Sequence, residues 1–229
     1  MDKDAKHKAS MEKQKSNVDA SIAAADTEQS IVLLLTGNGK GKTSSAFGMV
    51  MRAMGYGQRV GIVQFIKGEQ LSGEELFARE HLPDSDFYQM GTGFTWDTQN
   101  RQSDIEAAER TWAEAARMLQ DPAFDLVVLD EITYMLSFDY LDEAQVIKTV
   151  QARPEHQGVV LTGRGGGSGL QTLADTVSEV KEVKHAFRAG IKARKGVDYS
   201  VRDSIHPALR LKPFVAYKSI NAFFQGVWG

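Results

Sequence analysis

A glycine-rich segment, TGNGKGKTSS at residues 36–45, constrains this chain more than any other feature. It follows the apolar, β-prone run IVLLL at residues 31–35 and precedes a segment with helix-forming character. This succession predicts strand, phosphate loop and helix. Glycines allow backbone N–H groups to turn inward around phosphate oxygens, where a Cβ would obstruct the approach, and the start of the next helix favours anions. We therefore expect a nucleotide to bind here.

The residue types of this segment predict separate roles. Lys42 would supply a positive charge to phosphate, and Thr43 would supply a hydroxyl to Mg²⁺. The usual phosphate-loop pattern begins with glycine, whereas this chain has Thr36 at that position. The alternative interpretation is a glycine-rich turn that merely joins a strand to a helix. We assign nucleotide binding to Gly37, Asn38, Gly39, Lys40, Gly41, Lys42, Thr43 and Ser44.

Composition limits the classes of protein that this sequence can encode. At 229 residues the chain can fill one α/β core with short segments outside it. A net charge of −3 argues against a surface matched to nucleic acid. There is no cysteine, so a bound metal would need oxygen or nitrogen ligands. Because no apolar run approaches the roughly 20 residues of a membrane span, we expect a cytoplasmic protein without a membrane partner.

Two acidic residues follow a second apolar run. Residues 124–129 predict a buried strand that delivers Asp130 and Glu131 at its carboxyl end. Residues 59–65, RVGIVQF, predict another strand, which would pair in parallel with the strand before the phosphate loop. Ligands of open parallel sheets bind beyond the carboxyl ends of the strands, so both acids could reach Mg²⁺ beside Thr43. An acidic cap at a helix N-terminus is the alternative.

The segment at residues 67–100 predicts irregular structure and is too long for a simple connection. Long loops of α/β domains tend to carry binding groups. Phe94 and Trp96 lie near its centre in GTGFTWDTQ, where they could present two aromatic faces to a flat ligand. A pair of ordinary core aromatic residues is the alternative.

The second half of the chain predicts further alternation of helices and strands. Ser103 and Glu106 form a capping-box pattern before an amphipathic helix to residue 119, with Trp112 in the core. Residues 141–153 predict a helix, residues 158–162 a buried strand, and 174–183 a short strand.

An arginine follows the strand predicted at residues 158–162. Arg164 would stand at the tip of that strand, where it could meet phosphate; a surface arginine is the alternative. His185, beyond the short strand, is expected to be structural or on the surface.

Three regions are expected. Residues 1–30 predict a polar segment that forms either a marginal helix or a solvated tail, residues 31–199 the phosphate-loop domain, and residues 200–229 an extension without clear periodicity.

Taken together, TGNGKGKTSSAFG, RVGIVQFIKG, GTGFTW, VVLDEITYML, LTGRG and EVKHAFRAGIKARKGVDY resemble the RecA-like, P-loop family of corrinoid adenosyltransferases. The resemblance covers roughly residues 7–199 and includes Thr36, which is itself characteristic of the family. It implies an α/β fold with a mostly parallel sheet flanked by helices. Members transfer the 5′-deoxyadenosyl group of ATP to the cobalt of a reduced corrinoid and release triphosphate. The glycine-rich loop after Arg164 and the extension from residue 200 depart from the family's pattern.

The resemblance also implies partners and roles. ATP and a reduced corrinoid would be the substrates, Mg²⁺ or Mn²⁺ the metal, a reduced flavoprotein the kind of electron donor, and a homodimer the assembly. Lys42 would neutralise the triphosphate, Thr43 with Asp130 and Glu131 would organise the metal, and Phe94 with Trp96 would contact the corrin ring. The N-terminal segment would close over both substrates.

Two rival functions remain open at this stage. A P-loop ATPase that moves on nucleic acid would use Glu131 to position water, and a nucleotide-dependent binding module would have no turnover. The modest net charge and the absence of a basic or aromatic track argue against the motor.

Overall fold

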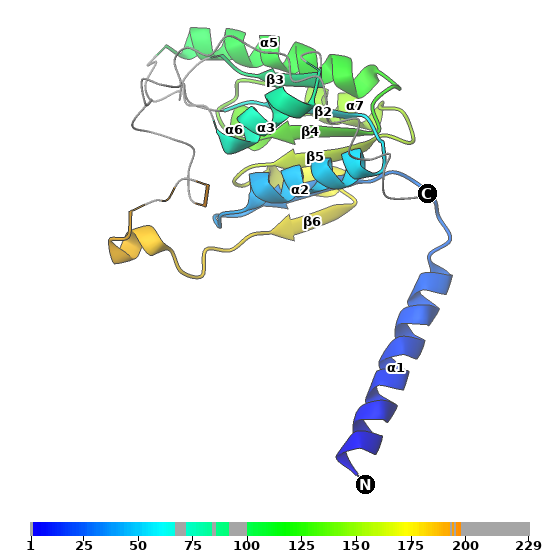
Figure 1. Cartoon of the computed structure of the whole chain (residues 1–229). Helices are drawn as coiled ribbons and strands as arrows, with labels where there is room; N and C mark the ends of the chain where they lie inside the picture. Colours follow the sequence, from blue (N-terminus) through cyan, green and yellow to red (C-terminus); the bar gives the residue numbers. More distant parts are fainter. Residues whose placement is uncertain are drawn as a thin grey trace, which may run out of the picture.

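The structure is a computed structural model that describes residues 2–66, 72–83, 86–91, 100–192, 194 and 196–197 of the chain. A single sheet lies at its centre, between helices (Figure 1). The six strands are β1 (Val32–Thr36), β2 (Val60–Gln64), β3 (Phe87–Gln89), β4 (Leu126–Asp130), β5 (Gly158–Thr162) and β6 (Thr176–Glu179). Their spatial order is β3-β2-β4-β5-β1-β6, and every pair of neighbours is parallel. The predicted pairing of β2 with β1 was wrong, because β4 and β5 lie between these two parallel strands. All carboxyl ends therefore meet at one edge.

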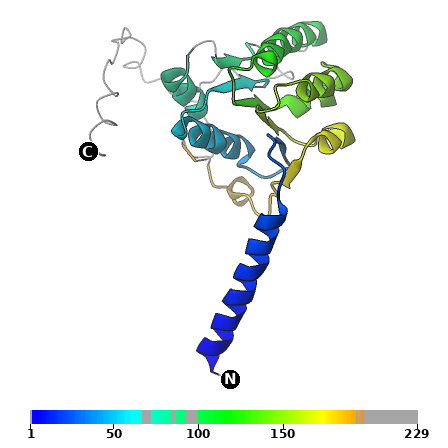
Figure 2. The same cartoon turned by 90° about the vertical axis from the view of Figure 1, so that its right-hand side faces the viewer.

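Helices connect these strands and cover both faces of the sheet. They are α2 (Lys42–Gly55), α3 (Gly73–His81), α5 (Arg101–Gln120), α6 (Ile132–Ser137), α7 (Glu143–Gln151) and α8 (Gly167–Leu173). The helix α1 (Lys3–Ala24) precedes the first strand, and the 3₁₀ helix η2 (Ala186–Ala189) follows the last. Figure 2 shows the sheet edge-on, with α2 and α3 on one side and α5, α7 and α8 on the other. The predicted α/β class with a parallel sheet flanked by helices is confirmed.

Alternation along β1 divides the apolar side chains between two cores. Leu33 and Leu35 belong to the core that contains Phe47 of α2, whereas Leu34 belongs to the core that contains Trp112 of α5. Period-two alternation produces this division because successive side chains of a strand point to opposite faces. Both faces of this strand are covered, which explains the apolar run VLLL at residues 32–35. The predicted core position of Trp112 is confirmed.

The segment predicted to be irregular at residues 67–100 contains regular structure, so that prediction was wrong in part. α3 begins after Ser72, whose hydroxyl accepts a hydrogen bond from the Glu75 N–H at 3.0 Å, and the strand β3 follows it. The pattern Ser72-x-x-Glu75 is the capping box that would have revealed this helix. Phe94 and Trp96 lie in residues 92–99, outside the described residues.

Two predicted helix boundaries also need correction. α5 begins at Arg101 and is capped by the Asn100 side chain, which accepts from the Ser103 N–H at 3.3 Å, rather than by a capping box that starts at Ser103. The pair Met54-Gly55 in the sequence predicts a glycine cap at the end of α2, but the glycine with positive φ there is Gly57, at 74°. Asparagine and serine are about equally favourable as N-cap residues. The sequence alone therefore did not show which of Asn100 and Ser103 caps the helix.

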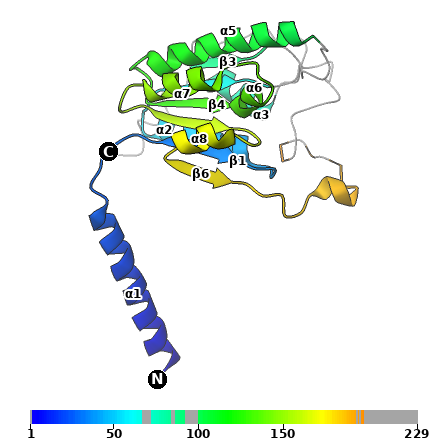
Figure 3. The same cartoon turned by 180° about the vertical axis from the view of Figure 1, so that it is seen from behind.

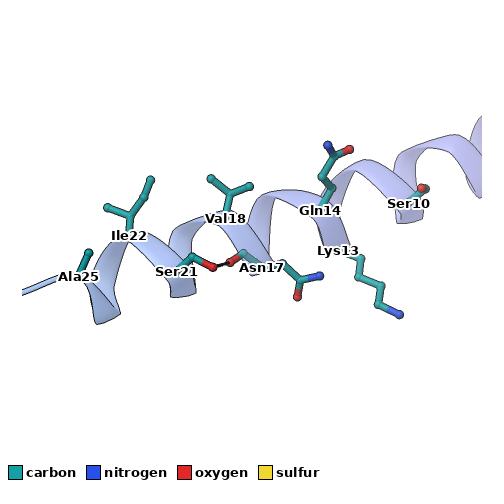
Figure 4. Close-up of a pocket in the computed structure, with 8 residues that line it drawn as sticks. All are labelled: Ser10, Lys13, Gln14, Asn17, Val18, Ser21, Ile22 and Ala25. Carbon is teal, nitrogen blue, oxygen red and sulfur yellow. Dashed lines mark hydrogen bonds between the residues drawn. The ribbon is translucent and has the colours of Figure 1, made fainter. Parts of the chain in front are cut away.

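The N-terminal segment forms the helix α1, one of the two expected alternatives, and none of its residues is buried. Figures 1 and 3 show that α1 joins the domain at the end of the sheet opposite the carboxyl ends of the strands. A hollow along α1 is lined by residues that include Lys13, Val18, Ile22 and Ala25 (Figure 4). It lies far from the strand ends and is therefore not the candidate nucleotide site.

No helix among the described residues has the length and apolar character needed to cross a membrane.

Candidate functional site

Polar side chains end four neighbouring strands at the same edge of the sheet. Thr36 ends β1, Gln64 ends β2, Asp130 ends β4 and Thr162 ends β5. All four are buried. Buried polar groups need partners, and the strand order brings these side chains and the start of α2 within reach of each other. The carboxyl edge of the sheet is therefore the candidate site.

The phosphate loop occupies residues 37–41 between β1 and α2. Its Gly37 has a φ of 101°, and a Cβ there would overlap the Val180 carbonyl oxygen. The N–H of Gly39 donates to the same oxygen at 2.7 Å. The segment that follows β6 thus supports the loop from outside, and glycine is required because both the conformation and the space exclude a side chain.

Lys42 begins α2, and its side chain is buried. Its Nζ donates to the carbonyl oxygens of Gly37 at 2.8 Å and Gly39 at 2.9 Å. The ammonium group therefore lies inside the loop, held by two of the loop's own carbonyl oxygens.

Charges around Lys42 show which residues share its environment. Burial lowers the pKa of Lys42; the Glu131 carboxylate raises it, the Arg164 guanidinium lowers it and the Asp130 carboxylate raises it. Two acids and two bases thus act on one another at this edge. Sequence reasoning had placed all four in one site, and the structure brings them together.

Asp130 accepts hydrogen bonds from side chains of three other elements of the site. Its Oδ1 accepts from the hydroxyls of Thr43 at 3.0 Å and Thr162 at 2.7 Å, and its Oδ2 accepts from Gln64 Nε2 at 2.9 Å. A carboxylate is fixed in place when several donors hold both oxygens. The Thr43–Asp130 contact joins two oxygen groups that were predicted to act on one metal ion, across 87 residues of sequence.

Gln64 and Thr162 were missed by the sequence analysis. Each is a polar residue at the end of an otherwise apolar strand, in GIVQF and GVVLT, and that position was the available signal. Thr162 also accepts from the Glu131 N–H at 2.9 Å, so one hydroxyl holds both acidic residues.

Glu131 follows β4 with a φ of 61° and precedes α6. This left-handed conformation is uncommon for a residue other than glycine, and it turns the chain sharply between strand and helix. Burial raises the pKa of the Tyr134 hydroxyl, and the Glu131 charge acts in the same direction. The Glu131 carboxylate therefore lies near both Lys42 and Tyr134.

The remaining predicted residues divide into two groups. Asn38, Lys40 and Ser44 are exposed around the loop, and Arg164 is exposed after β5; their contacts with nucleotide stay predictions. Phe94 and Trp96 are outside the described residues, so their contact with a flat ligand also stays a prediction.

The phosphate loop follows β1 and the acidic pair lies at the carboxyl end of β4, with β5 between these two strands. With the lysine and threonine at the start of α2, this order defines the RecA-like class of P-loop nucleotide-binding proteins. Comparison with known sequences narrows the class. The profile of the ATP:corrinoid adenosyltransferases BtuR/CobO/CobP matches residues 28–199, and the chain belongs to that family.

Individual relatives are similar over nearly their whole length. A corrinoid adenosyltransferase of Pseudomonas aeruginosa is 52% identical over 198 residues, which cover 86% of this chain and 98% of that protein. Corrinoid adenosyltransferase CobA of Salmonella typhimurium is 50% identical over 196 residues, 86% of this chain and 99% of the relative. A corrinoid adenosyltransferase of Escherichia coli strain K12 is 48% identical with the same coverage. The resemblance seen in the sequence is confirmed.

Proposed function

We propose that this protein transfers the 5′-deoxyadenosyl group of ATP to the cobalt(I) of a reduced corrinoid, in the synthesis or salvage of adenosylcobalamin. The cobalt–carbon bond forms at C5′ while the bond from C5′ to the triphosphate oxygen breaks, and triphosphate leaves with the electron pair. Membership in the family supports this reaction. The observation that carries it in the structure is the Thr43–Asp130 hydrogen bond beside the buried Lys42.

Cobalt(I) is so strong a nucleophile that the attack needs no general base. The protein must instead hold the two reactants in line and neutralise the charge of the leaving triphosphate. The loop at residues 37–41 and Lys42 would neutralise the triphosphate charge from one side, and Arg164 would do so from the other. A site with two cations and no histidine among the residues described above suits such a reaction.

Mg²⁺ or Mn²⁺ fits the oxygen groups of Thr43 and Asp130, with Glu131 nearby. No group of three or more His, Cys, Asp or Glu side chains that could hold a metal occurs in the described part of the chain. The ion would therefore bind together with ATP, whose phosphates complete its ligands, as is usual for Mg²⁺. When bound, it would neutralise phosphate charge, while Thr43 and Asp130 would fix where that charge lies.

Product analysis distinguishes this function from ATP hydrolysis by a motor on nucleic acid. The protein should convert ATP and chemically reduced cob(I)alamin to triphosphate and a carbon–cobalt product, visible as a change in the corrinoid absorbance. ADP and phosphate without a corrinoid product would favour the ATPase instead. Neither product, with ATP bound, would favour the binding module.

Phe94 and Trp96 are proposed to lie against the lower face of the corrin ring. Cobalt(II) in water keeps an axial ligand whose donated electrons make reduction to cobalt(I) difficult. Two aromatic side chains could displace that ligand and exclude water, and their rigidity limits the entropy lost on binding.

Phe94→Ala and Trp96→Ala should therefore bind ATP normally but lose most activity when supplied with cobalt(II) and a mild reductant. Chemically pre-reduced cobalt(I) should restore much of the rate. An equal loss in both assays by variants of unchanged thermal stability would remove the ligand-displacement role from these residues.

A reduced flavoprotein is proposed as the electron donor, a homodimer as the assembly, and the cytoplasm as the location. These proposals rest on the family resemblance and on composition. The N-terminal segment is proposed to close over the substrates, which would require α1 to leave the position seen here, where it lies at the opposite end of the sheet (Figure 1).

Residues 200–229 are proposed to be an extension outside the catalytic domain of residues 31–199. The family profile ends at residue 199, which supports this division. A chain that ends at Tyr199 should fold and adenosylate cob(I)alamin at a rate within about twofold of the full chain, because no family residue is lost. Circular dichroism and the same absorbance assay check this. An unfolded product would show that the extension completes the core.

A further inference from the structure

We propose that Thr36 and Thr133 are positioning residues that hold the loop of residues 163–166, here called the arginine loop, against the phosphate loop. They would thereby fix where Arg164 meets the triphosphate. This inference rests on the proposed function, because it assigns a means of positioning one of that function's phosphate-binding residues.

Two hydroxyl groups hold two successive carbonyl groups of the arginine loop. Thr133 Oγ1, from α6, donates to the Arg164 carbonyl oxygen at 2.9 Å. Thr36 Oγ1, from the end of β1, donates to the Gly165 carbonyl oxygen. Both threonines are buried, and the two bonds are partly buried. The loop is therefore attached at its centre to two separate elements of the site.

The backbone of the arginine loop needs such attachment. Gly163, Gly165 and Gly166 have φ values of 145°, 82° and 108°. Glycine reaches these conformations readily but also has the most conformational freedom to lose. A Cβ at Gly163 would overlap Thr133 Oγ1, so the close approach to Thr133 itself requires glycine. The glycines that flank Arg164 thus permit the contacts, and the threonines restrict the freedom that glycine brings.

Thr36 has a second significance because it occupies the position where phosphate loops usually begin with glycine. It is the last residue of β1 and immediately precedes Gly37. A glycine there could not make the bond to Gly165. The departure from the usual pattern is thus explained by a contact that ties the start of the phosphate loop to the arginine loop.

The electrostatic environment agrees with this geometry. The Arg164 guanidinium contributes to lowering the pKa of Lys42, after burial of the lysine as the main cause. It also acts on Tyr134, which lies next to Thr133 in α6. Arg164 therefore carries its charge near Lys42 while its side chain stays exposed to an incoming ligand. Displacement of such a group by about 1 Å can cost about 100-fold in rate.

The test uses Thr36→Val, which keeps the shape but removes the hydroxyl, and Thr36→Ser as the matched control that keeps it. Each is made in the wild type and in Arg164→Ala. The measurements are kcat/KM for ATP with pre-reduced cob(I)alamin and, independently, the affinity for inorganic tripolyphosphate by calorimetry.

In the wild-type background, Thr36→Val should lower both quantities about 10-fold, and Thr36→Ser should change them by about twofold or less. In the Arg164→Ala background, Thr36→Val should change them by less than about twofold, because the group that it positions is already gone. Thr133→Val should behave in the same way. The thermal midpoint of each variant identifies any that fail to fold. If Thr133→Val fails to fold, Thr36→Val and Thr36→Ser are sufficient to test the proposal.

An equal loss in both backgrounds would overturn the proposal, since Thr36 would then act on the phosphate loop and not through Arg164. No loss in the wild type, or no effect of Arg164→Ala alone, would also overturn it. Failure of the proposed function gives a different result: the wild type would form no carbon–cobalt product, while tripolyphosphate binding would still report on the coupling of Thr36 to Arg164.

Discussion

Replacing Lys42 with alanine is expected to lower kcat/KM for ATP by about 100- to 1,000-fold or more. Its Nζ is held inside the phosphate loop by two carbonyl oxygens, where it is already in place to meet triphosphate. A preorganised charge in a buried site stabilises developing negative charge far more than it would in water, and loss of one such donor typically costs this factor. The measurement is the absorbance assay with pre-reduced cob(I)alamin, which isolates the transfer step from reduction.

The matched control is Lys148→Ala, which removes the same group from an exposed position on α7. It should have wild-type activity. Burial already lowers the pKa of Lys42, so the charged side chain carries a desolvation cost in the absence of nucleotide. Removal of the Lys42 side chain should therefore leave the thermal midpoint within a few degrees of the wild type.

Thr43→Ala should lose activity to a similar extent as Lys42→Ala. Near-normal transfer by both Lys42→Ala and Thr43→Ala would contradict the assignment of this site.

The sequence alone was sufficient for the elements whose signal is local. The phosphate loop requires consecutive residues of special type, and β1, β2, β4 and β5 are largely buried strands that are apolar up to their last residue. The position of Asp130 could be predicted because the carboxyl ends of all strands in a parallel sheet lie at the same edge, where ligands bind. These features depend on residues that are close in sequence, so pattern and propensity suffice.

The missed features depend on residues that are distant in sequence. Thr162 reaches Asp130 across 32 residues and Gln64 reaches it across 66, and both contacts need the strand order to be known. The role of Thr36 could not be predicted because its partner, Gly165, is 129 residues away. Threonine and glutamine are both ordinary residues at the end of a strand. The neighbouring sequence therefore does not distinguish one that positions a functional group from one that does not.

α3 was missed for another reason. Its local signal at Ser72 and Glu75 is present, but the surrounding glycines and polar residues are typical of one long loop. The same interpretation was applied to Phe94 and Trp96, and it stays a prediction there. A capping pattern inside a glycine-bearing segment thus indicates a helix even where the composition of the segment favours a loop.

Replacing Asp130 with asparagine is expected to lower activity by at least about 100-fold and to raise the Mg²⁺ concentration needed for half-maximal activity more than 10-fold. Asparagine has nearly the same shape, but it lacks the negative charge that would attract the ion. The measurements are activity and ATP binding, each over a range of Mg²⁺ concentrations. The matched control is Asp139→Asn, an exposed aspartate with a φ of 52° that asparagine tolerates equally well.

The hydrogen bonds of Asp130 explain why this variant should still fold. An asparagine Oδ1 can keep the bonds from Thr43 and Thr162, and its amide nitrogen would then face Gln64. Gln64 Oε1 is buried with no hydrogen-bond partner in the described structure. Rotation of the Gln64 amide by 180° would turn this oxygen toward the new donor. The hydrogen bond between residues 64 and 130 can thus re-form with donor and acceptor exchanged. The thermal midpoint should therefore fall by only a few degrees.

The two possible roles of Asp130 therefore give separate results. If the carboxylate acts only as a structural acceptor, Asp130→Asn lowers the thermal midpoint but leaves the Mg²⁺ dependence unchanged. If the carboxylate acts on the ion, the Mg²⁺ dependence shifts while the fold persists. The role of the rotated Gln64 amide has its own test: Gln64→Leu cannot supply that amide, so the double variant with Asp130→Asn should be much less stable than either single variant. An unchanged Mg²⁺ curve in a folded Asp130→Asn protein would remove Asp130 from the metal site and leave Thr43 without its proposed partner there.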